Sequence, residues 1–143
     1  CIRDRVYAAG ERPGGGPWRL AIEKPMDDGR AIETVVELSD QGMATSGDYR
    51  IFYRTEGQRI SHTIDPRTGR PVVDGPASAT VIAPTATEAD GWATALMVLG
   101  DPGGLTLAET WEIPALLLVR DKDGRIVQRR NALFPEPVER ATP

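Results

Sequence analysis

The chain has 143 residues, enough for one domain with a hydrophobic core that depends on neither disulfides nor metal ions. Its formal net charge of −4 offers no broad basic surface, which disfavours nucleic acid as a partner. The only cysteine, Cys1, cannot form an intrachain disulfide, so cysteine usage does not indicate a redox compartment. No apolar run approaches the roughly 18 residues of a transmembrane helix, and the first residues lack a signal-peptide pattern.

The first half of the chain predicts β-structure. The Gly- and Pro-rich segment Gly10–Pro17 is expected to be irregular, and Asp40-Gln41-Gly42 is a turn that favours antiparallel pairing of the strands on either side. Glu56-Gly57 predicts a hairpin that presents Tyr49 and His62 near its open end. The strands predicted from β-prone or alternating segments are Trp18–Ile22, Ala31–Leu38, Met43–Ser46, Arg50–Arg54 and Arg59–Ile64.

One main helix is predicted in the second half. Thr85 and Glu88 have the spacing of a capping box, and good helix formers continue to Leu99 before Gly100 and Pro102 end the helix. A helical stripe for packing follows the start of this helix, and a short second helix is expected over Leu105–Thr110. The stripe consists of Ala89, Trp92, Ala93, Leu96 and Leu99.

Three further strands complete the prediction, over Ser78–Ala83, Pro114–Val119 and Arg125–Gln128. The nearly continuous apolar run of the second indicates a strand buried on both faces. Residues 135–143 are expected to be a frayed tail. The sequence therefore predicts an α+β fold, a mostly antiparallel sheet covered by one main helix.

Asp90 and Thr94 form the first candidate site. They lie one helical turn apart, so a carboxylate and a hydroxyl oxygen can face one place, which suits a hard cation such as Mg²⁺. The structural alternative is that Thr94 bonds its own helix carbonyl while Asp90 favours the first helical turn through the dipole.

A second candidate site lies in the loops. His62 is the only histidine and can accept a proton from an attacking hydroxyl, although a histidine at a hairpin end can equally be structural. Asp65 can bond the backbone of the turn Asp65-Pro-Arg-Thr-Gly69. The segment Ser46, Gly47, Asp48 and Tyr49 could approach phosphate or flavin, or Gly47 could only permit a tight turn.

Taken in order, four motifs resemble the FAD:protein FMN transferase family, also called the ApbE family. The motifs are Ala44–Arg50 (ATSGDYR), Ser61–Gly69 (SHTIDPRTG), Ser78–Pro84 (SATVIAP) and Ala89–Leu96 (ADGWATAL) with Leu99-Gly100. The resemblance implies that residues 1–143 are the C-terminal part of an ApbE-like, T-fold-like domain whose N-terminal half is absent. Because the chain begins with Cys and not Met, Cys1 is expected to be either a mature lipoprotein terminus or the result of a truncation, which we favour.

The resemblance further implies a reaction, a magnesium-dependent transfer of FMN from FAD onto a Thr or Ser hydroxyl of an acceptor protein, releasing AMP. It implies Asp90 and Thr94 as magnesium ligands, His62 as the catalytic residue near the acceptor hydroxyl, and Ser46–Tyr49 at the flavin site. Redox-pump subunits or similar proteins would be the acceptors, in the periplasm or at the inner membrane, and a homodimer stays open. The alternatives are a non-catalytic flavin- or nucleotide-binding module and an inactive fragment.

Overall fold

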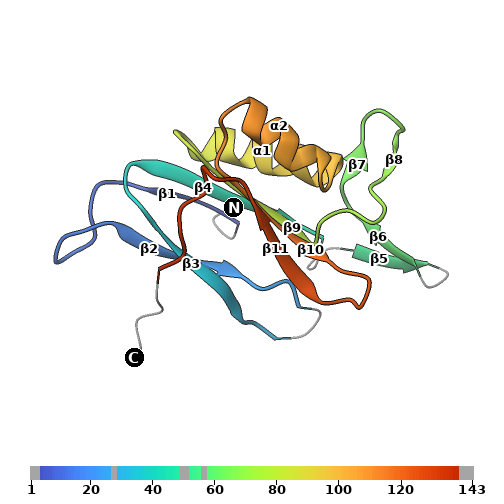
Figure 1. The fold of residues 1–143 in the computed structure, drawn as a ribbon, viewed down its shortest axis with the longest axis horizontal. Helices are drawn as coiled ribbons and strands as arrows, with labels where there is room; N and C mark the ends of the chain where they lie inside the picture. Colours follow the sequence, from blue (N-terminus) through green and yellow to red (C-terminus); the bar gives the residue numbers. More distant parts are fainter. Residues whose placement is uncertain (1–3, 27–28, 49–51, 56–57, 139–143) are drawn as a thin grey trace.

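A five-stranded antiparallel sheet forms the centre of the molecule (Figure 1). The computed structural model describes residues 4–26, 29–48, 52–55 and 58–138. Every neighbouring pair in this sheet is antiparallel, and helices cover one face, which confirms the predicted α+β class. In spatial order its strands are β1 (Arg5–Ala8), β4 (Gln41–Gly47), β9 (Ser78–Ala83), β10 (Ala115–Arg120) and β11 (Ile126–Arg130).

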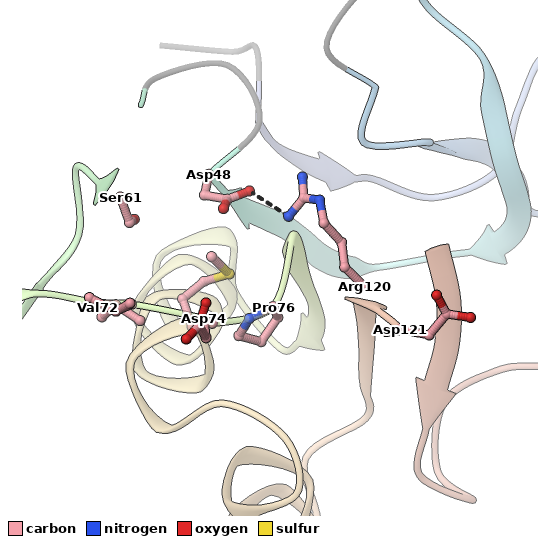
Figure 2. Close-up of a pocket in the computed structure, with 10 residues that line it drawn as sticks. Asp48, Ser61, Val72, Asp74, Pro76, Arg120 and Asp121 are labelled. Atoms are coloured by element: carbon pink, nitrogen blue, oxygen red, sulfur yellow. Dashed lines mark hydrogen bonds and ion pairs between the residues drawn. The ribbon is translucent and has the colours of Figure 1, made fainter. Parts of the chain in front are cut away.

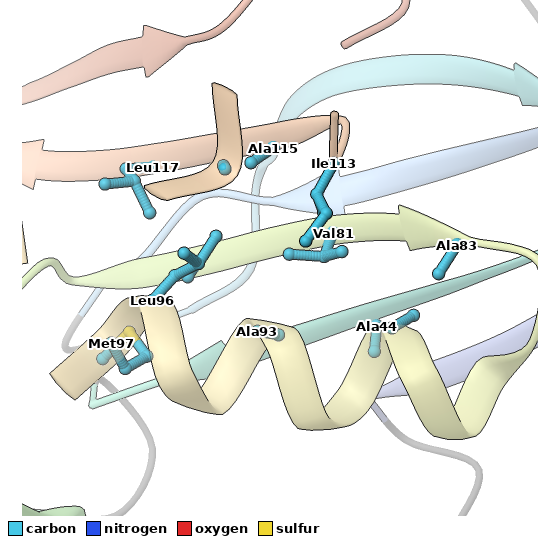
Figure 3. Close-up of a cluster of buried hydrophobic side chains, with 12 residues drawn as sticks. Ala44, Val81, Ala83, Ala93, Leu96, Met97, Ile113, Ala115 and Leu117 are labelled. Carbon is cyan, nitrogen blue, oxygen red and sulfur yellow. The ribbon is translucent and has the colours of Figure 1, made fainter. Parts of the chain in front are cut away.

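Helix α1 (Ala86–Leu99) lies on the covered face, with α2 (Gly103–Thr110) beside it (Figure 1). The predicted stripe is confirmed at Ala89, Ala93 and Leu96, which are fully buried. It is wrong at Leu99, which is 37% exposed, because Met97 takes the buried position in the last turn. The strand residues that complete this helix-side core are Ala44, Ala79, Val81, Ala83, Ala115 and Leu117 (Figure 3).

The start of α1 is held by the predicted capping box. Thr85 Oγ1 accepts a hydrogen bond from the Glu88 amide at 3.2 Å, and the Glu88 carboxylate accepts one from the Thr85 amide at 3.2 Å. These bonds satisfy two of the backbone donors that a helix start leaves without partners. The helix ends as predicted at Gly100, whose amide donates to the carbonyl of Leu96.

A two-stranded sheet covers the opposite face. Strands β2 (Trp18–Glu23) and β3 (Ile32–Leu38) pair antiparallel and bury Ile22, Val36 and Leu38. Successive side chains of a strand point to opposite faces, so β9 and β10 contribute to both layers. The residues of the central sheet in this second core are Ala8, Met43, Ile82, Leu116 and Leu118.

The predicted pairing across Asp40-Gln41-Gly42 is wrong. Strand β3 pairs with β2, whereas β4 lies between β1 and β9 in the central sheet. The chain changes layers at Asp40, which has a φ of 52°, and the Asp40 carboxylate accepts a hydrogen bond from the Gly10 amide at 2.8 Å. This pairing lets β3 bury Val36 and Leu38 against the sheet instead of extending its edge.

Two small antiparallel pairs stand beside the end of α1 (Figure 1). The predicted hairpin is confirmed as β5 (Phe52–Thr55) and β6 (Gln58–Ser61). Strands β7 (Ile64–Asp65) and β8 (Arg70–Pro71) flank the predicted turn.

Part of the C-terminal tail contacts the fold. Phe134 is buried, and the Val138 amide donates to the carbonyl of Val35 at 3.0 Å. Residues 139–143 lie outside the described part of the chain, so the assignment of 135–143 as frayed stays a prediction. Neither helix in the described residues is long and apolar enough to span a membrane.

Candidate functional site

The packing of α1 on β4 brings two of the predicted site segments together. The hydroxyl oxygens of Ser46, on β4, and Thr94, on α1, are 3.1 Å apart. Thr94 Oγ1 is also 3.1 Å from the backbone carbonyl oxygen of Asp90, one turn earlier in the helix. Ser46, Asp90 and Thr94 therefore form one group of oxygen atoms, which we call the oxygen cluster.

The Asp90 carboxylate is engaged by an arginine from the neighbouring strand. Arg5 Nη1, on β1, donates to Asp90 Oδ2 at 2.5 Å, and Arg5 Nε lies 3.4 Å from Asp4 Oδ1. Both side chains of the Arg5–Asp90 pair are partly exposed, at 40% and 33%. The guanidinium thus lies between two carboxylates at the rim of the oxygen cluster.

The structural alternative for Asp90 and Thr94 holds only in part. Thr94 does bond the helix carbonyl, as that alternative requires. Since α1 begins at Ala86, Asp90 is its fifth residue and lies beyond the first turn, where the dipole has most effect. The acidic residue of the first turn is Glu88, which the capping box already uses. The dipole therefore does not account for Asp90.

The chemistry of the oxygen cluster fits a hard cation. The atoms in contact are two hydroxyl oxygens and the backbone carbonyl oxygen of Asp90, and the same residue carries a carboxylate; all are oxygen ligands that Mg²⁺ accepts. In the part of the chain that the structure describes, no group of three or more His, Cys, Asp or Glu residues gathers around one point. Water and phosphate oxygens would have to complete the six-fold coordination. Asp90 and Thr94 as magnesium ligands stay a prediction.

Asp48 lies at the end of the same strand region, beside a cavity of about 430 Å³ (Figure 2). Asp48 is only 8% exposed to solvent, and its carboxylate accepts a hydrogen bond from Arg120 Nη1 at 3.4 Å. The Asp48 amide donates to the carbonyl of Ala77, which continues the pairing of β4 with the start of β9. The ion pair thus links the residue that follows β4 to the last residue of β10.

The cavity has a mixed lining. The charged residues Asp48, Asp74, Arg120 and Asp121 line it together with apolar residues such as Met97. Ser61, the residue before His62, also borders it. The cavity offers room for a ligand group next to the Ser46–Asp48 segment, and the assignment of that segment to a flavin site stays a prediction.

Gly47 has a role that the sequence left open. It is the last residue of β4 and pairs in register with Ser78, so the chain is extended there and does not form the tight turn of the alternative. Tyr49, the fourth residue predicted for the flavin site, lies outside the described residues.

His62 lies exposed between β6 and β7. The turn that follows it is held by Asp65, whose Oδ1 accepts from the Arg67 amide at 2.9 Å and whose backbone carbonyl accepts from the Gly69 amide at 2.8 Å. The side-chain hydrogen bond from the Arg67 guanidinium, with the bond from its amide, holds the pKa of Asp65 below its ordinary value. The structural role predicted for Asp65 is therefore confirmed.

Sequence reasoning missed two residues that contact the site. Arg5 binds the carboxylate of Asp90 from 85 positions away, and Arg120 binds Asp48 from 72 positions away. Arg5 belongs to β1, which has only four residues, so the sequence showed no alternating pattern that would have predicted this strand. Arg120 follows an apolar run and reads as an ordinary strand end. Only the folded arrangement of the sheet reveals either contact.

Comparison with known proteins identifies the family of this arrangement. The model of the ApbE family matches residues 4–117, a range that includes every residue of the oxygen cluster. The chain belongs to the ApbE family. The resemblance in the four sequence motifs is thereby confirmed.

Two relatives of the ApbE chain carry the name FAD:protein FMN transferase. The protein of Haemophilus influenzae is 43% identical over 132 residues, which cover 92% of this chain and 38% of that protein. The protein of Vibrio cholerae is 47% identical over 123 residues, which cover 86% of this chain and 37% of that protein. The ApbE chain thus spans less than two fifths of the length of these curated relatives.

Solved structures agree with the fold of this ApbE chain. The apo form of the flavinyl transferase ApbE of Pseudomonas stutzeri superposes with a TM-score of 0.78 at 43% identity, covering 92% of this chain and 40% of that one. The ApbE protein of Thermotoga maritima superposes with a TM-score of 0.75 at 30% identity, covering 90% of this chain and 40% of that one. These likenesses confirm the expected ApbE-like fold class.

Proposed function

We propose that this chain carries the C-terminal part of the site of an FAD:protein FMN transferase. The observation that carries the proposal is the contact between Ser46 and Thr94, because it joins two ApbE motifs into one oxygen cluster with Asp90. Identities of 43% and 47% to proteins of that name support it. The reaction proposed is transfer of FMN from FAD onto a Thr or Ser hydroxyl of an acceptor protein.

In the proposed reaction the acceptor hydroxyl oxygen bonds to the phosphorus that bears the flavin, the bond to the AMP oxygen breaks, and AMP leaves. The hydroxyl proton passes to a base near His62, which lies exposed between two short strands where a protein acceptor can reach it. Asp90 and Thr94 would hold Mg²⁺, which when bound offsets the negative charge of the pyrophosphate. The oxygen atoms of the chain position the reactants, and the bonds that form and break are those at the phosphorus atom.

A chimera tests this proposal directly. This chain replaces the matching 132-residue segment of the Haemophilus influenzae relative. The chimera is incubated with FAD, Mg²⁺ and an acceptor protein that bears a threonine in its flavin-acceptor sequence. Covalent flavin is read as fluorescence of the acceptor band on a denaturing gel. We expect transfer by the chimera, and none by its Asp90→Asn variant.

The parent relative serves as the positive control, and the isolated chain is assayed beside it. A folded chimera that binds FAD but transfers no FMN, while the parent is active, would contradict the proposal and favour a non-catalytic flavin-binding module. Activity of the chimera without activity of the isolated chain would support the proposal, since the chain spans only 38% of that relative.

A further inference from the structure

An internal cation already occupies the carboxylate that the proposed function assigns to the metal. Arg5 Nη1 lies 2.5 Å from Asp90 Oδ2 and donates to it. Charge-assisted bonds of a guanidinium to a carboxylate are among the stronger hydrogen bonds in proteins. A carboxylate that accepts such a bond has given up part of the charge and the lone pairs that a divalent cation needs.

We propose that Arg5 competes with the divalent cation for Asp90, so that metal binding has to displace the guanidinium. The inference rests on the proposed role of Asp90 as a metal ligand. Arg5 would then set the metal affinity of the site without being a ligand or a catalytic residue. Because two cations cannot share one carboxylate oxygen without mutual repulsion, each weakens the binding of the other.

The surroundings of Arg5 allow this displacement. Strand β1 is held by backbone pairing of Arg5 with Ala44 on β4, so the guanidinium can move while the strand stays in place. The side chain is 40% exposed, which leaves it a path towards solvent. Asp4 Oδ1, at 3.4 Å from Arg5 Nε, remains as a partner for the displaced charge. Release of Asp90 therefore does not leave a buried, unpaired cation.

The test measures binding of Mn²⁺ to the whole chain from the electron paramagnetic resonance signal of the free ion, with no FAD or acceptor present. Arg5→Gln removes the competing charge and should bind Mn²⁺ about fivefold more tightly than the parent, the equivalent of roughly 1 kcal/mol for a partly exposed ion pair. Arg5→Lys keeps the charge but loses the planar fork, and its affinity should lie between the two.

The matched control is Arg19→Gln. Arg19 pairs with Glu37 at 2.9 Å and is 41% exposed, close to the value for Arg5, but it lies on β2 in the opposite layer. This variant changes the net charge of the chain equally, so it reports the effect of charge alone. We expect its affinity for Mn²⁺ to exceed that of the parent by much less than the affinity of Arg5→Gln does.

Equal affinities of the Arg5→Gln and Arg19→Gln chains, including an absence of measurable binding in both, would overturn the inference. Weaker binding by Arg5→Gln would overturn it too, since Arg5 would then orient Asp90 for the metal. Asp90→Asn should abolish the gain in the Arg5→Gln background, and a gain that persists there would place the metal elsewhere. Because no transfer step enters the assay, loss of transferase activity in the chimera leaves these outcomes readable.

Discussion

The turn after His62 depends on one carboxylate. Asp65 accepts hydrogen bonds from the amide and the guanidinium of Arg67, and these bonds favour the charged form. They lower the pKa of Asp65 below the ordinary value of 3.8, so the unfolded chain takes up the proton at a higher pH than the folded chain does. The stabilisation is therefore complete above the ordinary pKa and is lost as the pH falls through the lowered pKa of the folded state.

Arg67→Gln should raise the pKa of Asp65 towards its ordinary value, because the largest cause of the lowering is the hydrogen bond from the Arg67 side chain. The carboxyl carbon chemical shift of Asp65, followed by NMR between about pH 2 and 6, measures this change. Arg70→Gln is the control, because Arg70 pairs with Asp65 in the β7–β8 ladder but is not among the causes that lower the pKa of Asp65. An unchanged midpoint for Asp65 in Arg67→Gln would show that the backbone bond alone sets the pKa.

Thr94 allows a second prediction for a single residue. Thr94→Ser keeps the hydroxyl that meets Ser46, whereas Thr94→Val keeps the shape and removes it. We expect the valine variant to bind Mn²⁺ about tenfold more weakly, as for loss of one oxygen ligand worth roughly 1.4 kcal/mol, and the serine variant to bind like the parent. Equal weakening in both variants would mean that the methyl group, through helix packing, matters more than the hydroxyl.

The oxygen cluster depends on how closely the helix α1 packs against the strand β4. A Cβ atom built on Gly42 would lie 2.3 Å from the Ala86 amide nitrogen and 2.4 Å from the Thr85 carbonyl carbon. These are backbone atoms at the start of the helix, so they cannot rotate away. Only glycine at this position allows α1 to pack so closely against β4, and this close packing brings Thr94 into contact with Ser46.

Gly42→Ala should destabilise the fold by about 2–3 kcal/mol, as expected for overpacking against backbone. Gly91→Ala is the matched control, because a Cβ there meets no atom within 4 Å and alanine favours the helix by roughly 0.5–1 kcal/mol. Urea unfolding of both variants gives the two free energies. A Gly42→Ala chain as stable as the parent would mean that α1 shifts on the sheet, and the Mn²⁺ affinity would then reveal whether the site survives.

Sequence reasoning succeeded for elements whose signals are local. The limits of α1 follow from Thr85, Glu88 and Gly100, which act on the backbone within a few residues. The prediction that β3 pairs with the strand after Asp40-Gln41-Gly42 was wrong. A turn specifies only a change of direction, whereas the pairing of β3 depends on which arrangement buries Val36 and Leu38. The extra strand β1 carries only four residues, too few for a periodic pattern.

For the candidate site too, the sequence predicts local relations between residues but not long-range contacts. The spacing of Asp90 and Thr94 places them on one face of a helix, which a sequence alone can indicate. The contact of Ser46 with Thr94 joins residues 48 positions apart, and that of Arg5 with Asp90 joins residues 85 positions apart. Charged residues are common on any surface, so nothing in the sequence distinguishes Arg5 as the partner of Asp90.

At the scale of the whole molecule, one sheet serves two cores. Neighbouring residues of β10 point to opposite layers: Leu117 lies in the helix-side core, and Leu116 in the core beneath β2 and β3. Both are essentially inaccessible to solvent. Because one strand supports both layers, the loss of packing on one face should loosen the other, and the chain should unfold as one cooperative unit.

Tryptophan fluorescence tests this coupling, because Trp18 packs against the β2–β3 core and Trp92 against the helix-side core. Variants that keep only one of these two, with phenylalanine at the other position and at Trp111, report one layer each during urea unfolding. Their transitions should coincide with far-ultraviolet circular dichroism of the same variant. Leu117→Ala, which truncates only the helix-side core, should lower stability by about 2–5 kcal/mol and shift the Trp18 transition as well. A Trp18 transition that Leu117→Ala leaves in place would mean that β2 and β3 unfold independently of the layer that carries the oxygen cluster.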